Sequence, residues 1–151
     1  MKKLYIAYGS NLNIEQMKYR CPTAKLVGIG TLENCAMDFR RISSNAYATI
    51  HPEEGSFVPV AFWEIDQKAE RALDMYEGYP RFYYKRTLNI TSADGSTKNA
   101  MVYIMNSKAT PGIPSSHYIQ TIYQGYLDVG LSVNILAGIC ESCGFSLEDM
   151  I

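Results

Sequence analysis

The stretch from Lys25 to Ile65 constrains the fold most, because it contains several strand-like segments in succession with no helical pattern between them. These segments are separated by Ser-Ser-Asn and Pro-Glu-Glu-Gly; they are Leu26–Leu32, Ala36–Arg41, Tyr47–His51 and Phe57–Ile65. Strands joined by short turns pair in antiparallel fashion. The stretch is therefore expected to form a largely antiparallel sheet.

A strand and a helix are predicted before this stretch. Leu4–Tyr8 is a short apolar run, broken by a Gly-Ser-Asn turn that leads into a helix at Ile14–Arg20. Asn13 is the expected helix cap, and Gln16 completes the spacing of a capping box. Cys21 precedes a proline, which favours the end of the helix there.

Helices and strands alternate after the stretch. Asp66 is expected to cap a helix that ends at Gly78 and has apolar positions on one face at Ala69, Ala72, Leu73 and Tyr76. The strands Phe82–Thr91 and Lys98–Met105 are predicted to form a hairpin across Asp94-Gly95. A loop at Asn106–Pro114 then precedes a helix opened by Ser115 or Ser116 and a last helix at Val133–Cys143. This order predicts an α+β domain whose curved sheet is packed by helices.

Length and charge indicate one domain, residues 1–151, with a small polar ligand. The chain can bury a sizeable core without a disulfide or a metal. Its 14 Lys and Arg nearly balance 15 Asp and Glu, which leaves no basic field for a nucleic acid or a membrane surface. The apolar run at the N-terminus is far shorter than a signal-peptide core, and no stretch is long enough to span a bilayer.

The four cysteines are expected to be reduced thiols in the cytoplasm, because no export signal accompanies them. Cys140 and Cys143 form a Cys-x-x-Cys pair, but no second pair or neighbouring histidine completes a zinc set and no thioredoxin-like βαβ unit surrounds them. Buried structural thiols are expected; a redox protein is the weakest alternative.

The first candidate site is the turn Tyr8-Gly9-Ser10-Asn11-Leu12. A glycine and two short polar side chains between a strand end and a helix start collect unpaired backbone N–H groups, which favour an anion such as a carboxylate. An ordinary capped turn explains the same residues. The turn lacks a lysine and phosphate-loop glycines, which argues against a nucleoside triphosphate.

Glu77 is the second candidate. It lies four residues beyond Leu73 and eight beyond Ala69, so it shares the apolar face of its helix and is expected to point inward. Burial and the negative end of the helix dipole both raise the pKa of a carboxyl group, which would make Glu77 a general base near neutral pH. A frayed helix end with a solvated Glu77 is the alternative that the residues leave open.

Two tyrosines complete the candidate set. Strand alternation puts Tyr84 on the face opposite Tyr83, and Tyr84 is the one expected to share a cavity with Glu77. Tyr118 follows the predicted helix start and precedes Gly125, where a missing side chain allows a close approach of backbone or ligand. Core packing accounts equally well for both tyrosines.

Taken together, these motifs resemble the γ-glutamylcyclotransferase-like family, also called AIG2-like. The resemblance rests on Tyr8-Gly9-Ser10-Asn11-Leu12, Glu77-Gly78, and Pro114-Ser115 with Tyr118, and it extends over most of the chain. It implies a small mixed, largely antiparallel β-barrel surrounded by helices. It also implies an enzyme that converts a γ-glutamyl amide into 5-oxoproline and a free amine, with no metal or organic cofactor, acting as a monomer or homodimer.

The resemblance also assigns roles to residues. Tyr8 to Leu12 would grip the glutamyl group, Glu77 would move the proton, and Tyr84 and Tyr118 would line the pocket. The Glu77-Gly78-Tyr79-Pro80 stretch is more similar to bacterial members of unassigned substrate, so the amine half stays open among amino acids, amines and a protecting group on a natural product. A non-catalytic module that binds a small carboxylated ligand is the alternative function.

Overall fold

Two long antiparallel strands form the frame of the protein, whose computed structural model describes residues 2–151. Strands β2 (Lys25–Arg41) and β3 (Ala46–Ile65) pair along almost their whole lengths, so the four expected segments join into two. The Pro-Glu-Glu-Gly punctuation is accommodated by a register shift between Glu33 and Cys35, where Asn34 adopts a φ of 57°. The Gly55 N–H donates to Asn34 Oδ1 at 3.1 Å, which ties the shifted segment to its partner strand.

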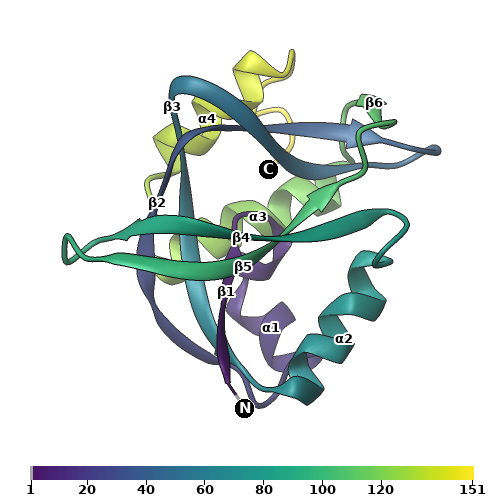
Figure 1. The fold of residues 1–151 in the computed structure, drawn as a ribbon. Coiled ribbons are helices and arrows are strands. Elements are labelled where there is room, and N and C mark those ends of the chain that lie inside the picture. The colour runs from purple at the N-terminus through teal and green to yellow at the C-terminus, as the bar shows by residue number, and fades with distance from the viewer. Residues whose placement is uncertain (1) are drawn as a thin grey trace.

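The strands close into a barrel. Strands β1 (Lys3–Ala7), β5 (Thr97–Met105) and β4 (Tyr83–Ser92) lie between β3 and β2, and β2 pairs again with β3 (Figure 1). The β1–β5 contact is parallel, whereas the other pairs are antiparallel. The expected mixed, largely antiparallel barrel is therefore confirmed. The segment predicted as a loop also contains a short strand, β6 (Thr110–Pro111), paired with the end of β2.

The predicted hairpin between β4 and β5 is confirmed. Its turn has Gly95 at a φ of 88°, a conformation that glycine adopts without steric cost. Asp94 Oδ1 accepts from both the backbone N–H and the hydroxyl of Ser96, which closes the turn.

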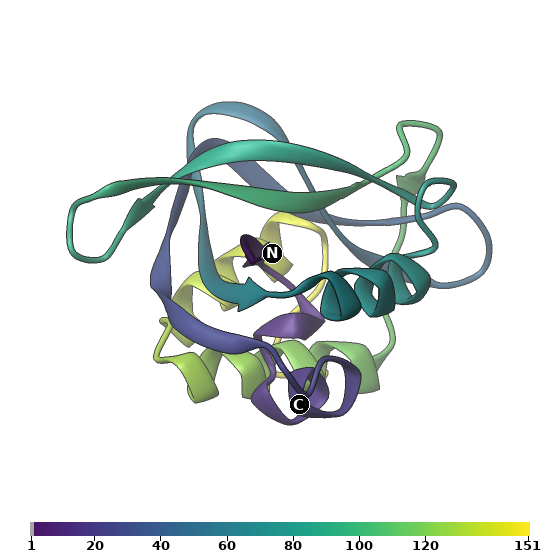
Figure 2. The same ribbon diagram turned by 60° about the horizontal axis from the view of Figure 1, so that its bottom comes forward.

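Four helices pack around the barrel: α1 (Ile14–Arg20), α2 (Gln67–Glu77), α3 (Ser116–Val129) and α4 (Val133–Ser142). Helices α1 and α3 lie side by side, and α2 runs between them and the β4–β5 hairpin (Figure 2). Asn13, Asp66 and Ser115 cap three of the helices through their side-chain oxygens, as predicted. Among residues 2–151, no helix combines the length and apolar character needed to cross a bilayer.

One detail of the first cap differs from the prediction. Asn13 Oδ1 accepts from the Gln16 N–H at 3.0 Å, but the Gln16 side chain does not reach back to Asn13. Instead, Gln16 Oε1 accepts from the Arg20 guanidinium at 3.0 Å. The backbone N–H of Asn13 is already bonded to the Ser10 carbonyl, which removes the donor that a complete capping box needs.

Candidate active site

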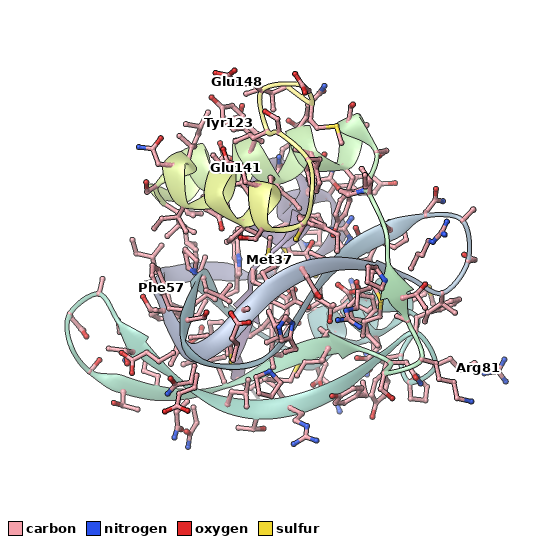
Figure 3. The ribbon with its side chains drawn as sticks, turned by 90° about the horizontal axis from the view of Figure 1, so that it is seen from above. Met37, Phe57, Arg81, Tyr123, Glu141 and Glu148 are labelled. Carbon is pink, nitrogen blue, oxygen red and sulfur yellow. The ribbon has the colours of Figure 1, made fainter. Side chains whose placement is uncertain are left out.

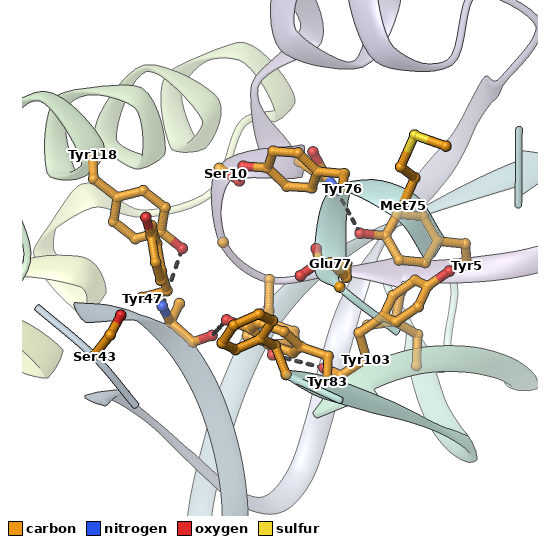
Figure 4. A pocket seen from close by; sticks show the side chains of 17 residues that line it. Tyr5, Ser10, Ser43, Tyr47, Met75, Tyr76, Glu77, Tyr83, Tyr103 and Tyr118 are labelled. Carbon is orange, nitrogen blue, oxygen red and sulfur yellow. Dashed lines mark hydrogen bonds between the residues drawn. The ribbon is translucent and has the colours of Figure 1, made fainter. Parts of the chain in front are cut away.

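A cavity of about 450 Å³ opens where the loop after β1, the end of α2 and the starts of β3, β4 and α3 converge. Glu77 lies near the centre of the close-up, with Tyr118 and Tyr47 on one side and Tyr5 and Tyr103 on the other (Figure 4). Among residues 2–151, Glu77 is the one charged side chain that lines this cavity. The cavity therefore combines a single carboxyl group with neutral polar groups, mainly phenols.

The Tyr8–Leu12 loop forms one wall of the cavity. After β1 ends at Ala7, the short 3₁₀ helix η1 (Ser10–Leu12) is closed by the Leu12 N–H, which donates to the Gly9 carbonyl at 3.0 Å. The N–H groups of Ser10 and Asn11 begin this turn and have no acceptor among residues 2–151. Ser10 Oγ lies 3.1 Å from the Tyr76 hydroxyl.

Leu12 does not line the cavity. Its side chain is 0% exposed and belongs to the hydrophobic core on the other side of the loop. The expectation that all five loop residues face the ligand is therefore wrong for Leu12, which anchors the loop instead. Tyr8, Gly9, Ser10 and Asn11 do line the cavity.

Both ends of the Asn11 side-chain amide form hydrogen bonds within the protein. Its amide nitrogen donates to the Tyr5 hydroxyl at 2.9 Å, and its amide oxygen accepts from the Arg20 guanidinium. The amide thus fixes the loop against α1, and its backbone N–H is the group left free to meet a ligand.

Glycines allow the loop to sit where it does. A Cβ on Gly125 of α3 would lie 2.7 Å from both Asn13 N and Leu12 Cβ, so only a residue without a side chain fits. The close approach predicted at Gly125 is thereby explained as contact with backbone. A Cβ on Gly9 would come within 3.2 Å of Ala48 Cβ, which makes that approach tight as well.

Glu77 is the last residue of α2 and points into the cavity, as its helical phase predicted. Gly78 ends the helix with a φ of 64°. Among residues 2–151, the Glu77 carboxylate has no hydrogen-bond partner. Burial raises its pKa to about 7, and the positive charge of Arg20 acts in the opposite direction. The group is thus placed and poised to exchange a proton near neutral pH.

Tyr118 and Tyr83 bind the two backbone groups of Ala48. The Ala48 N–H donates to the Tyr118 hydroxyl at 3.0 Å, and the Tyr83 hydroxyl donates to the Ala48 carbonyl at 2.7 Å. Tyr118 therefore keeps its own O–H proton for a ligand, whereas Tyr83 keeps oxygen lone pairs. Burial is the main cause of the raised pKa of Tyr83, and the nearby Tyr8 adds to it. Burial also raises the pKa of Tyr118. Both phenols are therefore neutral near pH 7.

Tyr8 has the same character as Tyr83. Its hydroxyl donates to the Tyr103 carbonyl at 2.7 Å, which leaves oxygen lone pairs facing the cavity. Its pKa is raised by burial first and by the nearby Glu77 carboxylate second.

The expectation for Tyr84 is wrong in position. Tyr83, not Tyr84, lines the cavity with Glu77. Tyr84 lies on the opposite face of β4, where the Arg86 guanidinium is 5.7 Å from its ring centroid. Four further tyrosines line the cavity and are not predicted from the sequence: Tyr5, Tyr47, Tyr76 and Tyr103. The strand alternation around Tyr5 and Tyr103 was a usable signal, but which face would be concave depends on barrel closure.

The two cysteines of the Cys-x-x-Cys pair lie away from the cavity. Cys140 is buried, and burial raises its pKa to about 11; burial also raises the pKa of Cys143. A reactive redox thiol needs a lowered pKa. The thiols therefore have the character of structural residues.

A closed mixed barrel with four surrounding helices, and a cavity at the loop after its first strand, defines the γ-glutamylcyclotransferase class of fold. The family model for gamma-glutamyl cyclotransferase, AIG2-like, matches residues 5–120, and the chain belongs to that family. The mouse and human proteins named gamma-glutamylcyclotransferase are each 28% identical to this chain over an alignment of 137 residues, and the match covers 85% of this chain and 72% of each relative.

Solved structures agree with this assignment. A structure named gamma-glutamyl cyclotransferase superimposes with a TM-score of 0.83 at 25% identity, and the match covers 92% of this chain and 86% of that one. YkqA from Bacillus subtilis superimposes with a TM-score of 0.77 at 18% identity, covering 96% of this chain and 55% of YkqA. The second match supports the fold alone.

Proposed function

We propose that this protein is a γ-glutamylcyclotransferase-type enzyme, which cyclises the γ-glutamyl group of a γ-glutamyl amide to 5-oxoproline and releases an amine. The observation that carries the proposal is the position of Glu77: a carboxyl group with a pKa of about 7, unpaired within the described chain, inside the cavity formed by the Tyr8–Asn11 loop. Membership of the family and the relatives named gamma-glutamylcyclotransferase support the same reaction type.

Substrate binding follows from the polar groups of the cavity. The free N–H groups of Ser10 and Asn11 suit the α-carboxylate of the glutamyl group. The α-ammonium group then lies toward Glu77, where the hydroxyl oxygens of Tyr8 and Tyr83 also accept hydrogen bonds. The free O–H of Tyr118 is the donor suited to the γ-carbonyl oxygen, on which negative charge develops.

The chemistry is an intramolecular aminolysis. Glu77 accepts a proton from the α-ammonium group, and the neutral amine attacks the γ-carbonyl carbon to close the five-membered ring. The protonated Glu77 then delivers this proton to the leaving nitrogen, and the γ-amide C–N bond breaks. The ring nitrogen, positively charged after the attack, gives a second proton to Glu77, which passes it to the released amine. In sum, two protons pass from the α-nitrogen to the leaving nitrogen, and the amine leaves as an ammonium ion. Because the attack is intramolecular, most of the task is to fold the glutamyl chain into a reactive shape.

The test is release of 5-oxoproline from a panel of γ-glutamyl amino acids, γ-glutamyl amines and glutathione, with wild type and Glu77→Gln measured side by side. We expect wild type to turn over at least one compound and Glu77→Gln to lose about 100-fold or more in kcat, the usual contribution of a positioned general base. Full activity in Glu77→Gln would remove Glu77 from the mechanism. No release from any compound, with binding retained, would favour the carboxylate-binding module.

A further inference from the structure

The cavity has a buried end and an exposed end. Tyr8, Ser10, Asn11 and Tyr83 are buried. At the other end lie residues that we call the rim: Ser43, Tyr47, Met75, Tyr76 and Phe82, all exposed and all lining the cavity. The rim residues lie in three parts of the fold: the β2–β3 turn with the start of β3, the end of α2, and the position just before β4.

The rim carries no charge, and most of its surface comes from one methionine and three aromatic side chains. Met75 is 86% exposed, Phe82 50% and Tyr47 42%. No lysine or arginine among residues 2–151 lines the cavity. Large exposed apolar and aromatic side chains that gather around the opening of one cavity favour a ligand with apolar surface there.

The cations closest to the rim in the sequence or beside its residues are directed or bound elsewhere. Arg41 precedes Ser43 by two residues, but its side-chain carbons lie against Gly112, where a Cβ would be 3.1 Å from Arg41 Cδ. Arg20 is held by Asn11 and Gln16 and stacks on the Tyr76 ring. Arg81 precedes Phe82 in sequence, but its side chain points away from the body of the molecule (Figure 3). Lys85 is paired with both Glu70 and Asp74. A second carboxylate at the rim would therefore have no partner of opposite charge among the described residues that line the cavity.

The orientation of the substrate decides which half meets the rim. Glu77 has to reach the α-ammonium group, so the glutamyl half occupies the buried end and the substituent on the γ-amide nitrogen extends outward. Resting on the proposed function, we infer that the leaving half of the substrate is an apolar or aromatic amine without a carboxylate. γ-Glutamyl amino acids and glutathione, whose leaving halves carry a carboxylate, are the disfavoured class.

A matched pair of compounds tests this inference. γ-L-Glutamyl-phenethylamide and γ-L-glutamyl-L-phenylalanine differ only in the carboxylate of the leaving half. We expect kcat/KM for 5-oxoproline release to favour the phenethylamide by about tenfold or more, because desolvating an unpaired carboxylate against the rim is costly. Equal values, or preference for the phenylalanine compound, would overturn the inference.

Binding separates this inference from the proposed reaction. The dissociation constants of both compounds for Glu77→Gln, measured by calorimetry, are expected to differ in the same direction by about tenfold. If neither compound releases 5-oxoproline but the phenethylamide binds more tightly, the reaction fails and the rim preference stands. A different result would overturn the rim preference alone: 5-oxoproline is released from other γ-glutamyl compounds, but the matched pair shows no preference or neither member of the pair binds.

A charge introduced at the rim gives a second, independent test. Ser43→Arg places a cation at the exposed end without removing an aromatic group, and Ser43→Gln is the neutral control. We expect Ser43→Arg to shift the ratio of kcat/KM values toward the phenylalanine compound by about threefold or more relative to Ser43→Gln, the size of an exposed charge pair. An unchanged ratio in Ser43→Arg would count against the inference.

Discussion

Arg20 lies with its guanidinium carbon 3.3 Å from the centroid of the Tyr76 ring, and this contact joins the cavity loop to the helix that ends at Glu77. The same guanidinium donates to the Asn11 side chain on the loop and to Gln16 on its own helix. Tyr76 in turn lies within hydrogen-bond distance of Ser10. Arg20 therefore holds both walls of the cavity and places a positive charge near Glu77.

Removal of this charge should move the pH profile. Arg20 lowers the pKa of Glu77, against the larger effect of burial. In Arg20→Gln the pKa of Glu77 should therefore rise above about 7, and the acidic limb of kcat/KM should move to higher pH by roughly half a unit or more. Arg20→Lys, which keeps the charge but loses the planar stacking, should keep the limb near its original position. Coincident limbs in wild type and Arg20→Gln would contradict this electrostatic role.

Glu77 should reduce the stability of the protein at high pH. Its pKa is raised by folding from 4.5 to about 7, so folding favours the protonated form. Below pH 4.5 the group is protonated in both states and no penalty arises. Between pH 4.5 and 7 the penalty grows, and above pH 7 it is complete, on the order of 2 kcal/mol for a partly exposed group.

Glu77→Gln should therefore be more stable than wild type at pH 8 by this amount, and the difference should shrink as the pH falls through 7 toward 4.5. Urea denaturation at a series of pH values measures it. A constant difference across the range would show that Glu77 does not titrate with a raised pKa.

Gly125 offers a test of the contact between α3 and the loop. In Gly125→Ala the new Cβ would overlap Leu12 and Asn13, which should destabilise the protein by about 1–3 kcal/mol despite the better helix propensity of alanine. Gly138→Ala is the matched control, because Gly138 is also helical but has nothing within 4 Å of the added Cβ. It should be neutral or stabilising by up to about 1 kcal/mol. Equal effects in thermal unfolding would argue against a tight fit at Gly125.

The adjacent residues Tyr83 and Tyr84 allow a cavity-facing position of β4 to be compared with one on the opposite face. Tyr83→Phe leaves the Ala48 carbonyl without its donor and removes an acceptor from the cavity, so we expect a loss of about 1–2 kcal/mol in stability and about tenfold in kcat/KM. Tyr84→Phe removes a hydroxyl on the opposite face and should leave kcat/KM unchanged. Steady-state kinetics on the best substrate decide between them. A larger loss in Tyr84→Phe would restore the original expectation for that residue.

The local signals in the sequence predicted much of the fold. Helix α1 begins and ends at the predicted residues because Asn13 caps it and Cys21-Pro22 ends it. The inward phase of Glu77 also follows from local spacing, since the apolar residues of α2 fix which side faces the barrel. The β4–β5 hairpin follows from Asp94-Gly95. Each of these features depends on residues within a few positions of one another.

The errors concern features that depend on distant contacts. Tyr83 and Tyr84 are adjacent and chemically alike, and a shift by one residue exchanges the two faces of a strand. The Tyr83 hydroxyl bonds to the Ala48 carbonyl, which lies 35 residues away in the chain, so nothing in the local sequence distinguishes Tyr83 from Tyr84. Similarly, two predicted strands merge into β3 across Pro-Glu-Glu-Gly, where Gly55 bonds to Asn34 of the partner strand β2. The apolar rim could not be predicted, because its residues meet only when the barrel closes.

Ala48 pairs in register with Phe39 of β2, yet both of its backbone groups point away from that strand and toward the two phenols. On this side of the cavity Ala48 has no strand partner, and Tyr83 and Tyr118 occupy the hydrogen-bonding positions that another strand would take. An extended peptide could pair there only by displacing both hydroxyls. This wall of the cavity is thus closed to a polypeptide backbone.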